Sequence, residues 1–291
     1  MGNLYVAIED WVKNRPYLHE IAKFQETIAA VIEKHSVKNY QAGYDEYDWE
    51  NIAPEIKKGI PVFKIVEIND KTMENAADLL LAIVDVLAEA NLPEKMVGHC
   101  QELKTVLQEY PNLAGKIISS VIEGNGIQPD DLNSSKIDEK VAVFLAWSSL
   151  SEALKPLKMK VAELLKEDKL WGKGYCPVCG QLPAMGQLIR VAKDRGRERE
   201  LICGCCQMRW QYKRIGCPYC DNLEQKSLKI IEVVEESDLR IDTCDKCKSY
   251  LKVYINEGNE QVALADWSTL HLDLIGEKNG FKRAGYWKYK L

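Results

Sequence analysis

The sequence predicts an α+β fold, in which an N-terminal all-α helical bundle is followed by two tandem cysteine-rich modules. Through most of residues 1–167, apolar residues recur every three or four positions, as in helices with one buried face. After about residue 170 this period fades, and short alternating segments appear between pairs of cysteines. The 291 residues exceed one average domain. We therefore expect a helical domain at 1–170 and modules at 171–212 and 213–291.

About six amphipathic helices with short connections are predicted in the N-terminal part. Proline at the start of a helix, or a polar residue that caps its first turn, indicates where a helix begins. The segment that contains Pro54, Gly59 and Pro61 is expected to be a loop between the first two helices. Asp70 and Thr72 are both candidate caps of the second helix. The expected helices begin near Pro16, Asp70, Pro93, Leu113, Asp138 and Pro156.

Three β-hairpins are predicted in the C-terminal part, because alternating apolar segments flank turn-forming residues there. The paired segments are 188–191 with 200–203, 228–234 with 239–243, and 250–255 with 261–264. The first hairpin has its turn at 194–197 and the last at 256–259. One more helix is expected over 266–279.

Eight of the ten cysteines form four Cys-x-x-Cys pairs with a regular spacing. Each cysteine of the last two pairs lies 41 residues after its counterpart in the first two, as in 176 to 217 and 203 to 244. We interpret this offset as a duplication of a unit made of a knuckle, a hairpin and a second knuckle. The predicted sites are Cys176, Cys179, Cys203 and Cys206, and Cys217, Cys220, Cys244 and Cys247. Joining the first pair to the fourth and the second to the third is the alternative, although it breaks the repeat.

Two Cys-x-x-Cys turns supply a tetrahedral set of four thiolates, which suits zinc or iron. The sequence therefore predicts two metal ions, zinc or iron, in modules of the rubredoxin or zinc-ribbon type. Glycine tolerates the positive φ that follows such a knuckle, and Gly180 has this position in CPVCG. Gln207, Asp221 and Lys248 have the same position in the other knuckles and fit it less well. Because four thiolates leave no open coordination position, metal-dependent hydrolysis is not expected.

The other candidate residues do not predict a catalytic site. Cys205 lies between two predicted ligands and is interpreted as a bystander, while Cys100 is interpreted as a core residue of a helix. His99 precedes Cys100, but adjacent residues on a helix point in different directions. No phosphate-binding glycine loop and no Ser/His/Asp arrangement is recognisable, so no catalytic residue is predicted and the protein is not expected to be an enzyme.

The charge distribution is uneven, but it does not predict nucleic-acid binding. Residues 1–170 contain 19 Lys and Arg against 28 Asp and Glu, whereas residues 171–291 contain 20 against 16. Two four-thiolate metal sites of about −2 each cancel the basic surplus. A basic run near Trp210 and Tyr212 is interpreted mainly as a solvated hairpin tip, and otherwise as a surface for an acidic protein. Its members are Arg190, Lys193, Arg195, Arg197, Arg199, Arg209, Lys213 and Arg214.

No apolar run reaches the roughly 18 residues that a membrane-spanning helix needs, so no membrane insertion is expected. The N-terminus has no basic start followed by an apolar stretch, as a signal peptide would. Cytoplasmic localisation is therefore predicted, and disulfides are not expected in that compartment.

The cysteine motifs and their surroundings resemble those of the FdhE family of formate dehydrogenase accessory proteins. The resemblance extends over about 176–283: CPVCG followed after two residues by Pro183, Trp210 and Arg214 between the second and third pairs, and Tyr-Leu-Lys at 250–252. The tail from Asp266 to Asp273 and the Gly-Phe-Lys-Arg at 280–283 also match. Cys205 departs from the family pattern, as does the tail after Arg283.

The resemblance implies a cytoplasmic, metal-binding accessory protein that acts like a chaperone on the catalytic subunit of formate dehydrogenase. Residues that it makes candidates for the partner surface are Trp210, Arg214, Tyr250, Lys252, Asp266 and Thr269, with packing inside the protein as the alternative. Two other hypotheses stay open: a zinc-ribbon protein that binds nucleic acid, and a rubredoxin-like electron carrier. The sequence does not predict an oligomeric state.

Overall fold

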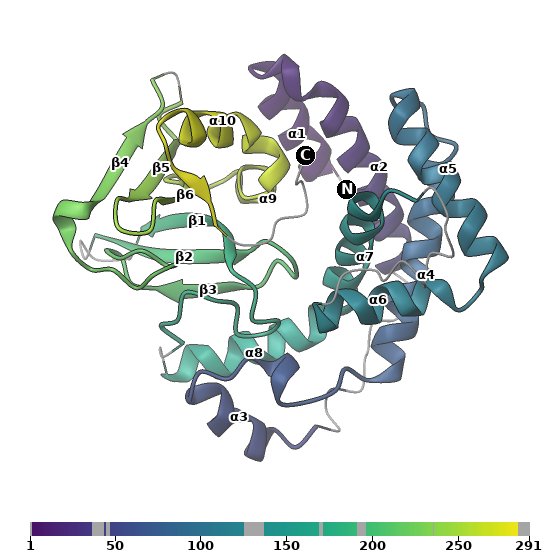
Figure 1. Cartoon of the computed structure of the whole chain (residues 1–291), viewed down its shortest axis with the longest axis horizontal. Helices are drawn as coiled ribbons and strands as arrows, with labels where there is room; N and C mark the ends of the chain where they lie inside the picture. The colour runs from purple at the N-terminus through teal and green to yellow at the C-terminus, as the bar shows by residue number, and fades with distance from the viewer. Residues whose placement is uncertain are drawn as a thin grey trace. The chain divides into compact units, whose positions relative to one another are not determined.

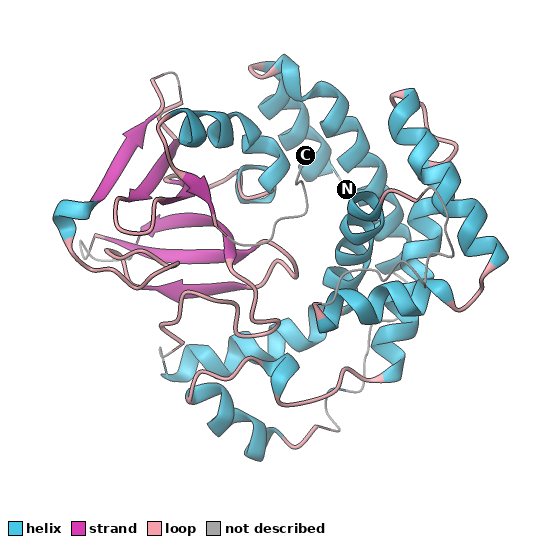
Figure 2. Ribbon diagram, in the orientation of Figure 1, coloured by secondary structure: helices cyan, strands magenta, loops and turns pink. Residues whose placement is uncertain are grey.

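The computed structural model describes residues 2–36, 44, 47–124, 137–168, 171–190, 196–234 and 236–284. These residues fall into two compact units. The helical unit contains those within Val12–Asp48 and Val66–Met159, and the sheet unit contains those within Met1–Trp11, Trp49–Ile65 and Lys160–Trp287. Among the described residues, helices form the N-terminal part and strands occur only from residue 183 on (Figure 2), which confirms the predicted α+β class. The domain boundaries at 170 and 212 stay a prediction.

The helical unit is built around one central helix. Helix α4 (Asp70–Leu87) packs against α2 (His19–Ser36), α5 (Glu94–Glu109), α6 (Leu113–Glu123) and α7 (Glu139–Ala153). Residues of α4 at helical spacing, Leu79, Leu80 and Ile83, are completely buried. The cap of α4 is Asn69, whose side chain accepts a hydrogen bond from the Thr72 amide, so Asp70 lies in the first turn instead. Asp138 caps α7 in the same way.

The prediction of a loop around Pro54 is wrong. It contains helix α3 (Trp49–Lys57), with Pro54 inside it. Ile52 and Ile56, four residues apart, are both buried. The free energy gained by burying this face outweighs the cost of the backbone hydrogen bond that Pro54 cannot donate. Helix α1 (Gly2–Lys13) was not predicted, while α8 (Lys155–Asp168) was. Among the described helices, none combines the length and the apolar composition needed to cross a membrane.

The two cysteine modules share one sheet. In the first module β1 (Pro183–Arg190), β2 (Arg197–Cys203) and β3 (Arg209–Tyr212) pair antiparallel in chain order. In the second, β4 (Leu228–Glu232), β5 (Leu239–Cys244) and β6 (Ser249–Tyr254) do the same. Parallel pairing of β1 with β6 joins them, so the strands follow the order β3-β2-β1-β6-β5-β4 (Figure 1). The 41-residue repeat is thus a repeat of three-stranded units.

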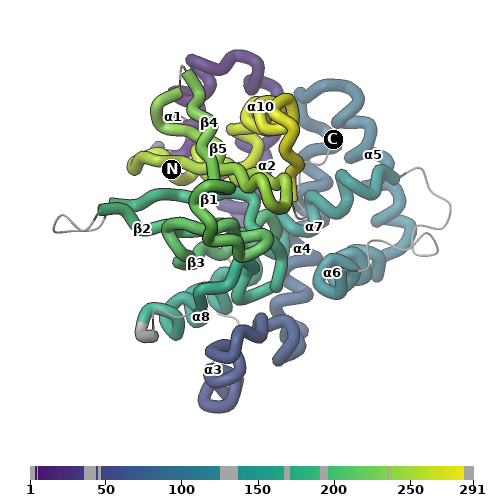
Figure 3. The backbone as a smooth tube through the Cα atoms, turned by 60° about the vertical axis from the view of Figure 1, so that its left-hand side comes forward, coloured from purple at the N-terminus to yellow at the C-terminus, as the bar shows by residue number. Residues whose placement is uncertain are grey.

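The third predicted hairpin is wrong. After β6 the chain forms α9 (Glu260–Ala263), a short 3₁₀ turn at Asp266–Thr269 and then α10 (Leu270–Lys278). One edge of β6 is paired with β5, and the other with β1 and with β7 (Lys282–Arg283), so no edge is left for 261–264. The predicted tail helix corresponds to α10, which lies against β5 and β6 (Figures 1 and 3). Gly276 allows this approach, because a Cβ there would lie 2.9 Å from the Tyr250 ring.

Candidate metal centres

The first module brings together four cysteine sulfurs. Cys176 and Cys179 precede β1, Cys203 ends β2, and Cys206 precedes β3. The Sγ atoms of Cys176 and Cys206 lie 3.5 Å apart, and those of Cys179 and Cys203 lie 3.4 Å apart. All four atoms are within 4.8 Å of one another. The hairpin β1–β2 is what returns the second knuckle to the first.

The second module repeats this arrangement with the counterparts 41 residues later. Its four sulfurs are also within 4.8 Å of one another. Cys217 and Cys247 are 3.6 Å apart, and Cys220 and Cys244 are 3.8 Å apart. Each cluster therefore joins the two pairs of its own module, and the structure does not show the interleaved arrangement.

All four knuckles have the same backbone turn. The residue after the second cysteine has a positive φ in each: 76° at Gly180, 61° at Gln207, 54° at Asp221 and 57° at Lys248. The amides of Gly180, Asp221 and Lys248 donate to the carbonyl of the first cysteine of their knuckle, at 2.8–3.0 Å. The left-handed turn is thus required by the knuckle, and three of the four positions form it without glycine.

The sulfur spacing fits a tetrahedral metal ion. With a metal–sulfur bond of about 2.3 Å, the edge of an S₄ tetrahedron is about 3.8 Å. The distances of 3.4–3.8 Å are close to this value. Zinc and iron both accept four thiolates, and the geometry does not distinguish them. A bound ion would supply a cross-link between the two knuckles and, if it were iron, a one-electron redox couple.

One thiol in each cluster has a lowered pKa: Cys203 in the first and Cys244, its counterpart in the repeat, in the second. Burial raises the pKa of Cys244, but amide groups of Cys247 and Lys246 outweigh it and bring the pKa down to about 7. Burial also raises the pKa of Cys203, yet hydrogen bonds from neighbouring cysteines hold it well below the usual value. The Cys205 amide lies 3.4 Å from the Cys203 sulfur, and the Cys205 thiol is one of the groups that lower this pKa, although it is not one of the four clustered sulfurs.

The clusters differ in their exposure to solvent. Three sulfur ligands of the first cluster, Cys176, Cys203 and Cys206, belong to buried residues, whereas in the second Cys220 is exposed. Residues 61–63 lie over the first knuckle: the Val62 amide donates to the Pro177 carbonyl at 2.9 Å, and Phe63 donates to Val178 at 3.0 Å. Sequence analysis did not identify this covering segment.

Five of the six candidate partner residues are buried. Trp210 donates its indole N–H to the Lys173 carbonyl at 3.0 Å. Lys252 is completely buried, and its ammonium lies 2.7 Å from Asp266 and 2.9 Å from Asp273. Tyr250 donates to Asp273 at 2.7 Å, and Thr269 donates to the Asp266 carbonyl at 3.3 Å. Only Arg214 is exposed. Packing, the alternative that the sequence left open, describes these five positions.

The buried charges form one neutral network that fixes the C-terminal segment. Arg283 on β7 pairs with both Asp266 and Asp273, so two cations face two carboxylates. Burial raises the pKa of Asp266, but Lys252 and Arg283 outweigh it and hold the pKa below its usual value. The network joins β6, the 3₁₀ turn, α10 and β7. The recognised tail motif, 266–273 and 280–283, thus includes three members of this network, Asp266, Asp273 and Arg283.

The predicted basic run does not form one patch among the described residues. Lys193 and Arg195, with half of the predicted turn at 194–197, lie outside them. Arg199 is buried and pairs with Asp242 at 3.2 Å, and Arg209 pairs with Glu200 at 2.8 Å. Cys100 is buried in α5 as predicted, and His99 is 3.8 Å from Asp138. None of these contacts forms a catalytic arrangement.

The fold and the clusters define a class of protein: a helical part followed by paired rubredoxin-like or zinc-ribbon modules with two four-cysteine sites able to hold metal ions. A sequence profile of the FdhE C-terminal domain matches residues 215–289. These residues lie in the second module and the tail. The comparisons with whole proteins extend the resemblance over most of the chain.

A protein FdhE homolog of Aquifex aeolicus is 29% identical over 272 residues, which are 91% of this chain and 84% of that protein. One from Haemophilus influenzae (strain Rd) is 31% identical over 201 residues, 63% of this chain and 64% of the other. The crystal structure of the FdhE protein from Pseudomonas aeruginosa shares the fold, with a TM-score of 0.62 and 20% identity over 96% of this chain and 92% of that one. These matches confirm the resemblance to FdhE proteins that the cysteine motifs predicted.

Proposed function

We propose that this protein is a cytoplasmic accessory factor for formate dehydrogenase, which binds the catalytic subunit of that enzyme during its maturation and does not itself catalyse a reaction. The observation that supports this most is the similarity to FdhE proteins over both the helical and the cysteine-rich parts. The residues that resemble the family are also those that build the clusters and the buried network, so the similarity includes the architecture around the metal sites.

In this proposal the metal ions are structural supports for the binding surface. Four thiolates complete a tetrahedral set, which leaves no position for water or substrate. Each ion would hold two knuckles together and so fix the strands between them. Because most candidate partner residues are buried, the surface must consist of exposed residues nearby, and Arg214 is the one candidate that qualifies.

Affinity purification with the catalytic subunit of a formate dehydrogenase tests the proposal. The tagged, metal-loaded protein is expected to retain the subunit, and retention should fall when Cys217→Ser removes one metal site. A matched control is Cys205→Ala, which changes a cysteine outside both clusters and should retain the subunit as the wild type does. Absence of binding with both metal sites intact would count decisively against the proposal.

A rubredoxin-like electron carrier is the second candidate, favoured by the exposure of Cys220 in the second cluster. An electron can leave a four-cysteine iron site most easily through an exposed ligand. Elemental analysis of protein purified without oxygen, followed by redox titration, separates the two functions. Iron with a reversible couple supports the carrier, whereas zinc at both sites excludes it, since zinc has no accessible redox step.

A further inference from the structure

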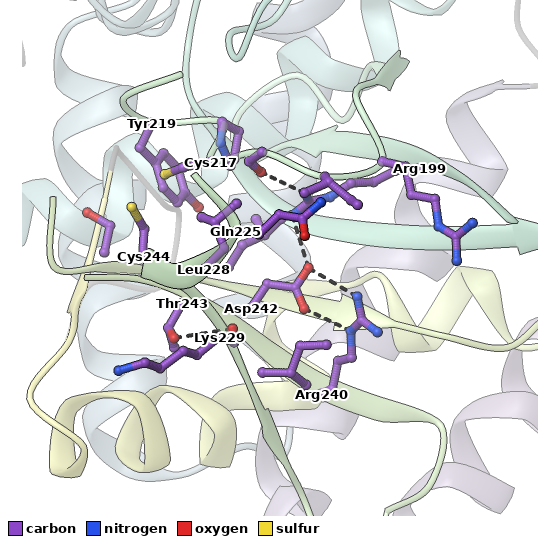
Figure 4. A pocket seen from close by; sticks show the side chains of 17 residues that line it. Arg199, Cys217, Tyr219, Gln225, Leu228, Lys229, Arg240, Asp242, Thr243 and Cys244 are labelled. Atoms are coloured by element: carbon purple, nitrogen blue, oxygen red, sulfur yellow. Dashed lines mark hydrogen bonds and ion pairs between the residues drawn. The ribbon is translucent and has the colours of Figure 1, made fainter. Parts of the chain in front are cut away.

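The third knuckle, residues 216–221, belongs to the second metal site but is contacted by residues of the first module. Arg199 of β2 is buried, and one of its terminal nitrogens donates to the Gly216 carbonyl at 2.9 Å, directly before the ligand Cys217. Its other terminal nitrogen lies 3.2 Å from Asp242 on β5. Arg199, Asp242 and Cys217 line the same pocket of about 260 Å³ (Figure 4). Arg199 therefore connects β2 of the first module to both the third knuckle and β5.

Tyr212, the last residue of β3, contacts a ligand residue of the second site directly. Its hydroxyl donates to the Cys217 carbonyl at 3.1 Å and lies 3.0 Å from the carboxylate of Asp221. Asp221 is the residue with positive φ that completes the turn of this knuckle. Tyr212 is itself buried. One side chain of the first module thus contacts both ends of the third knuckle, and hydrogen bonds of this kind orient metal ligands.

The first and third knuckles also lie directly against each other. Gly174 precedes the first knuckle, and a Cβ at this position would lie 1.8 Å from the carbonyl oxygen of Pro218. Glycine is therefore required for this close approach of two backbone segments. In the other direction, the Tyr219 hydroxyl donates to the Pro183 carbonyl at 3.1 Å, where β1 begins. The two modules are thus packed against each other at their metal-binding ends.

The four residues of the first module that contact the third knuckle all lie within six positions of a ligand of the first site. They are Gly174, Pro183, Arg199 and Tyr212. An ion at the first site would join the two knuckles of that module and so fix the strands β1, β2 and β3, which contain three of these residues. Without that ion, the strands lose the cross-link that positions these side chains. The state of the first site therefore affects the backbone that carries Cys217.

These contacts are not a copy of something within the repeated unit. The counterparts of Arg199 and Tyr212, 41 residues later, are Arg240 and Val253. Arg240 pairs with an aspartate of its own strand at 2.8 Å, and valine has no hydrogen-bonding side chain. The first knuckle instead accepts hydrogen bonds from the segment 61–63. Support of the third knuckle arises where one module meets the other.

We propose that the first module positions the third knuckle, so that a metal ion bound at the first site strengthens metal binding at the second. Tyr212 is the positioning residue in direct contact with the ligand residue Cys217. Removing a group that orients a metal ligand typically lowers the affinity for the metal by about 10- to 100-fold. The inference holds for zinc and for iron, since both use the same four thiolates. It does not depend on the proposed function.

Cadmium nuclear magnetic resonance of the full-length protein tests the coupling, because each bound cadmium ion gives its own signal. A chelator competes for the two ions, and the signal that is lost in Cys217→Ser identifies the second site. Cys176→Ser, which removes the first ion, should weaken cadmium binding at the second site by about tenfold or more. This loss is small beside the affinity of a four-thiolate site, so the second ion remains bound.

Tyr212→Phe should weaken cadmium binding at the second site by about tenfold, because the Cys217 backbone loses its hydrogen-bond donor. The cadmium signal of the second site should shift, and that of the first should not. The variant retains the buried ring, so the fold is kept. Tyr254→Phe is the matched control: it removes the hydroxyl of another buried tyrosine, at the end of β6 away from the knuckles. It should leave the affinity of the second site within about twofold.

Combining Tyr212→Phe with Cys176→Ser separates positioning through the first module from a purely local effect. Without the first ion, Tyr212→Phe should change the affinity of the second site by less than about twofold, since β3 is no longer held in place. The proposal is overturned if Cys176→Ser leaves the second site as tight as in the wild type, or if Tyr254→Phe weakens it as much as Tyr212→Phe does. It is also overturned if Tyr212→Phe acts equally strongly with and without the first ion.

Discussion

The two cysteine clusters have the same ligands, spacing and turns but different surroundings. In the first, residues 61–63 lie over the knuckle, and Val62 is completely buried. In the second, Cys220 is exposed, and the buried charges around Lys252 hold the C-terminal segment against the module. The two modules thus share the cysteine ligands and turns that would hold a metal ion, but they differ in the residues that cover the cluster. We expect the first site to retain its metal more firmly than the second.

The largest effect is expected from removing a ligand. Cys176→Ser and Cys217→Ser should each lower the metal content from two ions to about one and unfold the altered module, because metal binding contributes on the order of 10 kcal/mol to such folds. The helices of the helical unit should remain. Elemental analysis and circular dichroism measure both outcomes. Cys205→Ala is the control and should retain two ions; loss of an ion there, or of helical signal in either serine variant, contradicts the assignment.

The buried charges should stabilise the second module only. Lys252→Met leaves Asp266 and Asp273 to share Arg283, and breaking such a buried network typically costs about 3 to 5 kcal/mol. Gln211, the counterpart of Lys252 in the first module, is exposed. Gln211→Met should therefore change the free energy of unfolding by less than about 0.5 kcal/mol. Equal effects in chemical denaturation would show that the modules are not supported differently.

A substitution in residues 61–63, which cover the first cluster, tests whether this segment protects the metal site. Val62→Ala removes buried methyl groups and should cost about 2 kcal/mol. It should also bring the rate of metal release from the first site toward that of the second. Leu223→Ala is the control, because Leu223 lies beside the second cluster and is 53% exposed. If Val62→Ala leaves the release rate unchanged, the covering segment does not protect the metal.

In the unaltered protein, a coloured chelator should remove the two ions in two phases. The fast phase belongs to the second site, where the chelator can reach an exposed ligand, and we expect it to be about tenfold faster than the slow phase, a difference of about 1.4 kcal/mol in barrier. Cys220→Ser should abolish the fast phase. A single rate for both ions would contradict the comparison.

The smallest effects concern one pair of turn positions, Gly180 and its counterpart Asp221. Both have a positive φ, and a Cβ at Gly180 would lie 3.3 Å from Pro61. Gly180→Ala should therefore destabilise by about 1 to 2 kcal/mol, whereas Asp221→Gly should stabilise by less than about 1 kcal/mol. Thermal unfolding measures the two shifts, and shifts of the same sign would refute the argument.

Much of the fold was predictable because local patterns were clear. The helices that bury one face, such as α4, and the hairpins between knuckles followed from periodicity and turn residues. The failures have tertiary causes. Helix α3 was missed because Pro54 indicates a loop. The burial of Ile52 and Ile56 stabilises the helix in spite of this proline. The segment 261–264 alternates like a strand, but both edges of β6 are already paired.

The candidate site divides in the same way. Sequence alone identified the eight cysteines and favoured their grouping, because ligand chemistry and a fixed spacing act within each module, and the structure decided against the interleaved alternative. Only the tertiary structure decided which cluster is covered, that Lys252 and Asp266 are buried partners, and that Arg199 meets Asp242 beside a pocket. These outcomes depend on contacts between residues far apart in the chain, and solvent exposure is a property of those contacts. A repeat in the sequence determines its own ligands, whereas its neighbours in space determine its environment.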